Sequence, residues 1–184
     1  MQNLVEQIKS YLEISWQILR YPKDFFARIE KEKELKPALR FLAFLWILNS
    51  VVLFVIGLVL ALVSGTADIG VIVVNQIVAL AVNTVLGILF SVVFGLIIHV
   101  WIKIFRGRGS WKKSLQLVIY SMTPTMLLGW LQLTAFLATF YFMYLLYLGA
   151  QKLHEIPPRK SLAMFVIIPV VLIIIANLLS LGVI

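Results

Sequence analysis

Long apolar stretches alternate with short polar ones along most of this chain, whereas its first 37 residues are mixed. Residues 3–20 place apolar side chains at helical spacing, including Leu4, Ile8, Leu12 and Trp16, with polar side chains towards the other side. This pattern predicts an amphipathic helix that is too polar to span a membrane. Such a helix lies either in the lipid headgroup plane or against the protein's own cytoplasmic loops.

A second short helix is predicted to follow, because Pro22 suits the first turn of a helix. It runs from residue 22 to about residue 34, and Phe25, Phe26 and Ile29 form its apolar edge. We therefore expect residues 1–36 to be cytoplasmic amphipathic or interfacial helices, with Trp16, Pro22, Phe25 and Phe26 as interfacial residues.

Beyond Pro37, the apolar stretches have lengths suited to crossing a bilayer, which takes about 20 helical residues. They cover approximately residues 38–63, 78–102, 114–131, 132–150 and 161–183. The third and fourth are near the lower length limit and meet in a very tight turn. The sequence thus predicts an all-α fold, in which residues 37–184 form an integral membrane bundle of five transmembrane helices preceded by one or two amphipathic helices.

Composition supports this class of protein. Hydrophobic residues make up 62% of the chain and charged residues 13%, whereas a soluble domain is about 45–50% apolar and about 25% charged. The chain has no cysteine, which excludes disulfides, thiolate metal sites and cysteine nucleophiles.

The cations show which ends of the spans face the cytoplasm. Of the sixteen Lys and Arg residues, eight lie in the first 40 residues, five in residues 103–113 and three in residues 152–160. The five form a basic inner loop: Lys103, Arg106, Arg108, Lys112 and Lys113. The positive-inside rule then predicts a multi-pass protein of the cell (plasma or inner) membrane, with the N-terminus in the cytoplasm and the C-terminus outside. The net charge of +8 lies beside apolar spans, so we expect anionic lipid headgroups as partners rather than nucleic acid.

The predicted spans contain no Asp, Glu, Lys or Arg, which weighs against proton-coupled pumps and ion carriers. Asn49, Asn83, Asn177 and Tyr141 remain as a candidate intramembrane polar cluster, for which interhelical hydrogen bonding is favoured over a substrate site.

No set of residues suggests catalysis. His99 and His154 lack the spacing and further ligands of a metal site, and no nucleophile–base set or phosphate-binding loop is present. We therefore expect no enzymatic activity, no metal and no cofactor.

Pro124 is predicted to break the helix of the third span. It leaves the carbonyl of Tyr120 without its helical partner, and the hydroxyls of Ser121 and Thr123 are placed to compensate. The segment is either a packed kink or a hinge, and Pro169 has a similar effect in the fifth span.

Three short motifs follow one another along the chain. Residues 22–29 read Pro-Lys-Asp-Phe-Phe-Ala-Arg-Ile, residues 118–124 read Val-Ile-Tyr-Ser-Met-Thr-Pro, and residues 144–149 read Tyr-Leu-Leu-Tyr-Leu-Gly before a polar loop with Ser161. In this order they resemble the Yip1 family of small polytopic membrane proteins, in its prokaryotic branch, and the middle motif resembles its Tyr-x-x-x-Pro element. The resemblance covers nearly the whole chain and implies a five-helix membrane domain with a cytoplasmic N-terminus.

The family's eukaryotic members act in vesicle trafficking and associate with small GTPases and one another. This chain lacks their long N-terminal region and acidic, aromatic element, which argues against GTPase binding. We expect a non-enzymatic membrane scaffold or adaptor linked to membrane organisation or trafficking, as a homo-oligomer or with a membrane-protein partner. The alternative is a permeation or lipid-handling protein, such as a channel, transporter or scramblase, that uses the proline-broken third and fifth spans.

The predicted topology has a direct test. A membrane-impermeant reagent applied to intact cells is expected to leave residues 103–113 unlabelled, because this loop is predicted to lie in the cytoplasm. Labelling of this loop from outside, or a protein that is soluble without detergent, would contradict the prediction.

Overall fold

The computed structural model describes residues 2–65 and 69–180, and every regular element among them is helical, which confirms the all-α prediction. The elements are α1 (Gln2–Arg20), α2 (Pro22–Ile29), α3 (Lys36–Ser64), α4 (Ile69–Ile104), α5 (Trp111–Ser121), α6 (Thr123–Leu128), α7 (Gln132–Leu153), α8 (Pro158–Leu162), the π-helical turn η1 (Ala163–Ile167) and α9 (Ile168–Ser180).

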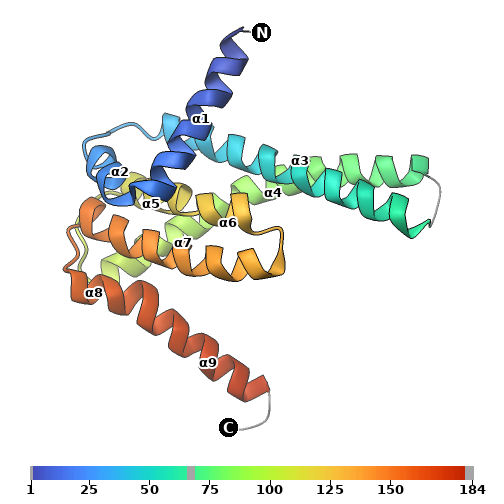
Figure 1. Ribbon diagram of the computed structural model, residues 1–184. Helices are drawn as coiled ribbons and strands as arrows, with labels where there is room; N and C mark the ends of the chain where they lie inside the picture. The colour runs from blue at the N-terminus through green and yellow to red at the C-terminus, as the bar shows by residue number, and fades with distance from the viewer. Residues whose placement is uncertain (1, 66–68, 181–184) are drawn as a thin grey trace.

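Helices α3 and α4 form a long hairpin, α5 and α6 pack against the half of it that is farther from its turn, and α7 packs against α5 and α6 (Figure 1). The hairpin extends well beyond the turn between α6 and α7. Loops 30–35, 105–110 and 154–157 lie together at the opposite end, which we call the basic end. Helix α1 runs across the direction of α3, and α9 leads away from the bundle.

Within the described residues, four helical segments are long and apolar enough to cross a membrane: Lys36–Ser64, Gly70–Ile104, Leu133–Leu153 and Pro158–Ile175. The predicted spans 38–63, 78–102 and 132–150 fall inside α3, α4 and α7, and the last residues of the span 161–183 lie outside the described residues. The span 114–131 coincides with two short helices, α5 and α6, instead of one long helix. The five-span count therefore stays a prediction in which α5 and α6 cross together.

The N-terminal elements agree with the sequence pattern, except at the end of α2. Helix α1 covers the predicted residues 3–20, and Pro22 occupies the first turn of α2. The prediction that the second helix continues to about residue 34 is wrong, because α2 ends at Ile29. The carbonyls of residues 29, 30 and 32 accept hydrogen bonds from a distant side chain, Lys113, and residues 30–35 form a loop around it.

The best-packed part of the molecule lies where α2, α3, α5 and α7 meet, and its fully buried side chains include Phe26, Phe41, Leu117, Ile119 and Leu145. Gly149 on α7 makes this approach possible. A Cβ atom at this position would lie 2.3 Å from Cδ1 of Leu117 and 2.9 Å from Cε1 of Phe26. The third sequence motif, which ends at Gly149, therefore packs against the first, which contains Phe26.

Both interior prolines coincide with departures from regular α-helix. Helix α5 ends two residues before Thr123, and the hydroxyl of Thr123 donates a hydrogen bond to the carbonyl of Tyr120 at 2.8 Å, which confirms the predicted compensation. Ser121 is also buried, but its hydroxyl has no partner among the described residues, so the prediction that Ser121 compensates as well is wrong. Before Pro169, the chain forms the π-helical turn η1, a common response to a missing backbone donor.

Candidate functional site at the basic end

A single lysine connects the N-terminal elements to the helical bundle. Lys113, in the first turn of α5, donates hydrogen bonds from Nζ to the carbonyls of Ile29 at 2.7 Å, Glu30 at 3.0 Å and Glu32. A cation at the C-terminal end of a helix satisfies free carbonyls and interacts favourably with the helix dipole. Burial lowers the pKa of Lys113, and the nearby Glu32 and Glu30 act in the opposite direction.

Two further hydrogen bonds attach the same N-terminal elements to the bundle. Gln116 of α5 donates from Nε2 to the carbonyl of Glu34 at 2.9 Å, and Tyr141 of α7 donates from its hydroxyl to the carbonyl of Leu19 at 2.7 Å. We call α1, α2 and loop 30–35 the N-terminal layer. Side chains from α5 and α7 thus bind its backbone at both α1 and the loop, which fixes its orientation on the bundle.

Tyr120, the tyrosine of the second sequence motif, lies under this layer. It is only 3% exposed, and its ring centroid is 4.9 Å from that of Phe25 and 5.6 Å from that of Phe41. Phe25 belongs to the first motif, so motifs that are distant in the sequence pack against one another. Pro124 is buried, and the half-buried Asn49 of α3 donates to a backbone carbonyl of α6.

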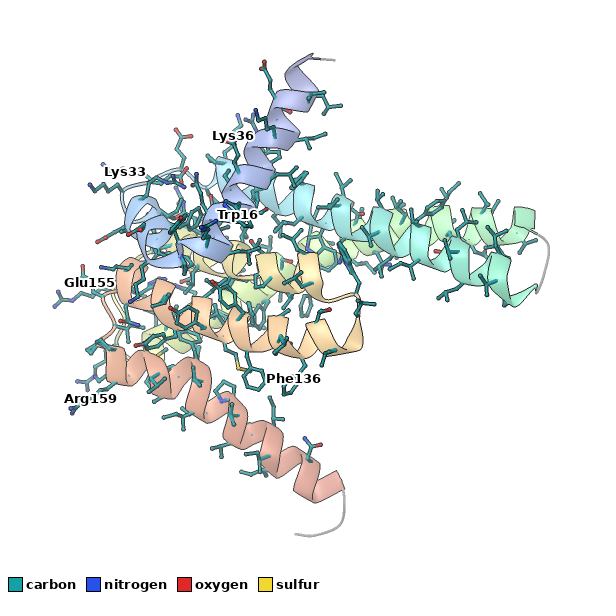
Figure 2. All side chains as sticks on the ribbon, viewed as in Figure 1. Trp16, Lys33, Lys36, Phe136, Glu155 and Arg159 are labelled. Atoms are coloured by element: carbon teal, nitrogen blue, oxygen red, sulfur yellow. The ribbon has the colours of Figure 1, made fainter. Side chains whose placement is uncertain are left out.

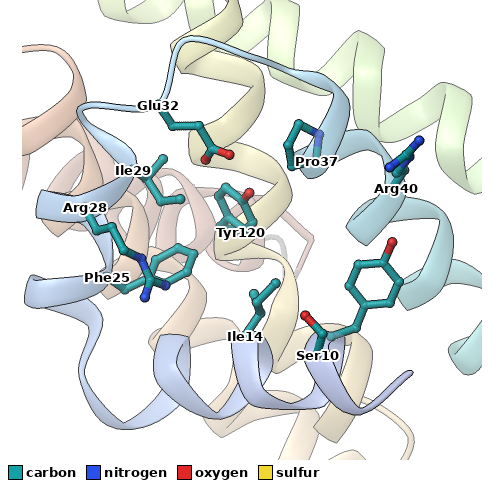
Figure 3. Close-up of a pocket in the computed structure, with 10 residues that line it drawn as sticks. Ser10, Ile14, Phe25, Arg28, Ile29, Glu32, Pro37, Arg40 and Tyr120 are labelled. Atoms are coloured by element: carbon teal, nitrogen blue, oxygen red, sulfur yellow. The ribbon is translucent and has the colours of Figure 1, made fainter. Parts of the chain in front are cut away.

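A cavity of about 400 Å³ opens above the Tyr120 ring, between α1, α2, loop 30–35, α3 and α5 (Figure 3). Its lining residues are Ser10, Tyr11, Ile14, Phe25, Arg28, Ile29, Glu32, Pro37, Arg40 and Tyr120. The lining combines aromatic surface with two guanidinium groups, one carboxyl group and hydroxyl groups. These groups suit a ligand that carries charge.

Arg28 and Arg40 lie on opposite sides of the cavity, with Glu32 and Tyr120 between them (Figure 3). Within residues 2–65 and 69–180, neither arginine forms an ion pair, and Arg28 donates instead to Oε1 of Gln17 at 2.6 Å. The Oε2 atom of Glu32 is buried and has no hydrogen-bond partner there. The two arginines are exposed, so among the charged groups of this cavity only the carboxyl group of Glu32 has a buried atom without a partner in the described part of the chain.

The pKa of Glu32 is raised from its ordinary value, mainly because burial removes water from its carboxylate. Lys113 and Arg28 lower this pKa and Glu34 raises it, but the effect of burial is the largest. A cationic group beside the carboxylate would offset the loss of hydration.

The two histidines are far apart in the sequence, but both form hydrogen bonds with one serine. His99 Nδ1 is 2.8 Å from the hydroxyl oxygen of Ser114, which is 3.2 Å from Nε2 of His154. Nδ1 of His154 is 2.8 Å from the carbonyl of Arg108, so it carries the proton and donates. Ser114 then donates to Nε2 of His154 and accepts from His99. No sequence spacing indicates this contact, because 15 and 40 residues separate the partners of Ser114 from it.

This histidine–serine chain links two loops of the basic end. The backbone N–H of Arg108 donates to the carbonyl of His154 at 2.8 Å, and Lys103 donates to the carbonyl of Gly109 at 3.0 Å. Gly109 has a φ of +113°, and a Cβ atom there would lie 2.7 Å from Nδ1 of His154. His154 is fully buried, so the arrangement fits a structural link. Among the described residues, no group of three or more acidic, His or Cys side chains is arranged to hold a metal.

The residues of the predicted basic loop have different surroundings. Arg106 is exposed, and Arg108 forms an exposed ion pair with Glu155 at 3.3 Å, which contributes little to stability. The Lys112 ammonium lies over the neighbouring Trp111 ring, 6.0 Å from its centroid, whereas the Lys113 ammonium donates to the loop between α2 and α3.

The members of the predicted intramembrane polar cluster bond to different parts of the chain. Asn49 donates from Nδ2 to the carbonyl of Met126 at 3.1 Å, Tyr141 donates to α1, and Asn177 donates to a carbonyl of its own helix. Asn83 is exposed on α4. Among the described hydrogen bonds, none joins two of these four side chains.

The predicted interfacial residues also differ in exposure. Trp16 is exposed, with the Arg20 guanidinium 5.5 Å from its ring centroid, whereas Pro22, Phe25 and Phe26 are buried. Arg28, Glu32 and Arg40 were not singled out in the sequence, because alternating charges usually mark a solvated face.

The long apolar helices, on which the N-terminal layer is held, define a multi-pass α-helical membrane protein. Such helices imply contact with the lipid bilayer. Comparison with protein-family models matches the Yip1 domain over residues 16–180, so the chain belongs to the Yip1 family. Searches of curated proteins and of solved structures found no match. The Yip1 resemblance expected from the three motifs is thereby confirmed.

Replacing Lys113 is expected to loosen the N-terminal layer. Lys113→Gln removes charge-assisted hydrogen bonds and should reduce stability by about 1.5–3 kcal/mol, with faster tryptic cleavage after Lys31 and Lys33. Lys112→Gln is the matched control, because Lys112 is adjacent and exposed. Equal cleavage rates for the two variants would contradict the anchoring role.

His154 is expected to make stability depend on pH. Burial lowers its pKa from 6.5 to about 4, so the unfolded chain gains a proton at a pH at which the folded chain does not. Stability is complete above about pH 6.5 and decreases by up to about 1.4 kcal/mol per pH unit as the pH falls towards 4. Thermal unfolding in detergent at about pH 7.5 and about pH 5 measures this decrease. The decrease should be smaller in His154→Gln, and an equal loss in the variant would show that other groups cause it.

Proposed function

We propose that this Yip1-family protein is a non-enzymatic membrane scaffold or adaptor, which presents its N-terminal layer to a second copy or to a membrane-protein partner. The supporting observation is the attachment of this layer by Lys113, Gln116 and Tyr141 to helices of the bundle. A surface that is already held in one orientation loses little conformational entropy when it binds. This property suits a scaffold, whose contacts must keep a defined geometry relative to the membrane.

The proposal places the basic end in the cytoplasm, with the N-terminus inside, the C-terminus outside and α5–α6 as the third of five crossings. The charged residues labelled in Figure 2, Lys33, Lys36, Glu155 and Arg159, lie at this end of the molecule. All sixteen Lys and Arg residues lie in residues 1–40, 103–113 and 152–160, and each of these stretches contains one of the loops that meet there, as the positive-inside rule requires of one cytoplasmic face. Anionic headgroups of the inner leaflet are then natural partners of the exposed cations.

Cysteine crosslinking tests the scaffold proposal, because the chain has no native cysteine. Lys23→Cys on the exposed side of α2 is expected to form a crosslinked adduct in native membranes, whose mass identifies a second copy or a partner. Arg159→Cys, exposed on α8 at the same end, is the matched control and should form much less adduct. Absence of an adduct with Lys23→Cys, together with a strictly monomeric protein in mild detergent, would refute the proposal.

A lipid-handling role is the second candidate, and an apolar cavity supports it. The cavity, of about 560 Å³, lies between α4, α7, η1 and α9, and its lining includes Phe94, Trp101, Phe142, Met164 and Pro169. An apolar lining beside a proline-broken helix suits a lipid chain better than an ion.

Lipid scrambling in liposomes tests the second candidate. The native protein should move labelled lipid faster than empty liposomes do, and Pro169→Ala should slow it because the alanine N–H restores helical bonding. Rates equal to those of empty liposomes would remove this candidate.

A further inference from the structure

The cavity above Tyr120 continues into an apolar groove between α1 and α3. This groove, of about 670 Å³, is lined by Leu4, Gln7, Ile8, Tyr11, Leu12, Arg40, Ala43, Phe44, Ile47, Leu48 and Val51. Tyr11 and Arg40 line both the cavity and the groove. A ligand that fills both spaces therefore needs a charged part, a junction near Arg40 and an apolar part.

The groove exists because α1 crosses α3 instead of lying along it (Figure 1). Apolar side chains on both walls stay exposed within this chain: Ile8 by 41%, Leu12 by 49%, Ile47 by 50% and Val51 by 42%. The groove begins beside the first turns of α3, an apolar helix that follows charged residues. This level corresponds to the boundary between headgroups and acyl chains, where a lipid chain enters such a groove directly from the bilayer.

The cavity offers groups for both charges of a zwitterion. The guanidinium groups of Arg28 and Arg40 form no ion pair with a carboxylate in the described part of the chain, and Tyr120 lines the same cavity. Guanidinium groups match the oxygens of a phosphate in geometry and charge. The buried Oε2 of Glu32 is an acceptor without a donor, and its carboxylate points towards Tyr120 (Figure 3).

We propose that the cavity and the groove together bind one phospholipid with a primary ammonium group, such as phosphatidylethanolamine. The phosphate lies at Arg40, the ammonium donates to the carboxyl group of Glu32, and an acyl chain follows the groove between α1 and α3. This inference goes beyond the scaffold function and does not depend on it, because it concerns a ligand of the N-terminal layer rather than a protein partner.

Other ligands leave part of the site unused. A choline headgroup has no N–H to donate to Glu32, and a purely anionic headgroup brings no cation to that carboxylate. Free phosphate leaves the apolar groove empty. The Lys113 ammonium is not available to Glu32 Oε2, because it donates to three backbone carbonyls.

Native mass spectrometry of the detergent-purified protein tests the proposal. The probe is an equimolar mixture of phosphatidylethanolamine, phosphatidylcholine and phosphatidylglycerol. The native protein should retain one phosphatidylethanolamine in preference to the other two. Loss of a single charge-assisted hydrogen bond corresponds to about a tenfold weaker affinity.

The variants separate the two charges of the headgroup. Arg40→Gln should weaken binding of all three lipids by about tenfold, because each contains the phosphate. Glu32→Gln should abolish the preference for phosphatidylethanolamine over phosphatidylglycerol. Arg159→Gln is the control, because Arg159 is exposed on α8 and lies outside both spaces, and it should change nothing.

A photoreactive label gives a second measurement that leaves the charged groups intact. Ser10→Cys places the label at the cavity and should crosslink to phosphatidylethanolamine, whereas the same label at Lys23→Cys should not. Equal retention of the three lipids, a preference for phosphatidylglycerol in the native protein, or unchanged binding in Arg40→Gln and Glu32→Gln would each overturn the proposal. If the charge variants fail to fold, failure of the Ser10 label to crosslink would overturn it instead. None of these results bears on the crosslinking test of the scaffold.

Discussion

The contact between the Lys113 ammonium and the carbonyls that follow α2 determines how the rest of the basic end is arranged. The last carbonyls of any helix lack partners inside the helix, and away from water they must find them elsewhere. Here one lysine from a helix more than 80 residues along the chain supplies the donors. This contact ends α2, turns loop 30–35 around α5 and brings Phe25 and Phe26 onto the bundle. The cavity above Tyr120 is a consequence, because its walls belong to the elements that Lys113 joins.

The same loop explains why charged groups are found at a partly buried position. Glu32 lies in the segment that Lys113 holds, so its backbone is fixed through its carbonyl while its carboxyl group faces the cavity. Tyr120 forms the floor because Pro124 ends the α5 helix just beyond it and Thr123 satisfies the carbonyl of Tyr120. The five residues of the Tyr-x-x-x-Pro element therefore both end the helix and provide the surface on which the N-terminal layer rests.

Patterns that depend on local chemistry were predictable from the sequence. The helix α1, the apolar lengths of α3 and α7, and the helix irregularities near Pro124 and Pro169 all follow from period, length and a missing N–H. The early end of α2 was not predictable, because it depends on Lys113. Likewise, the burial of His154 depends on Ser114 and on the carbonyl of Arg108, which no spacing reveals. Of the groups around the cavity, the sequence singled out Tyr120, Phe25 and Ile29 but not the charged ones, since alternating charges usually mark a solvated surface.

The unequal lengths of the helices have a consequence for the surrounding membrane. Helix α4 has 36 residues and α7 has 22, which correspond to about 54 Å and about 33 Å of helix. The side of the molecule formed by the hairpin therefore matches a thicker hydrocarbon layer than the side formed by α7, unless the long hairpin tilts. In a bilayer thinner than the hairpin is long, either the hairpin tilts or the lipids beside it stretch while those beside α7 do not, at a small energy for each ångström.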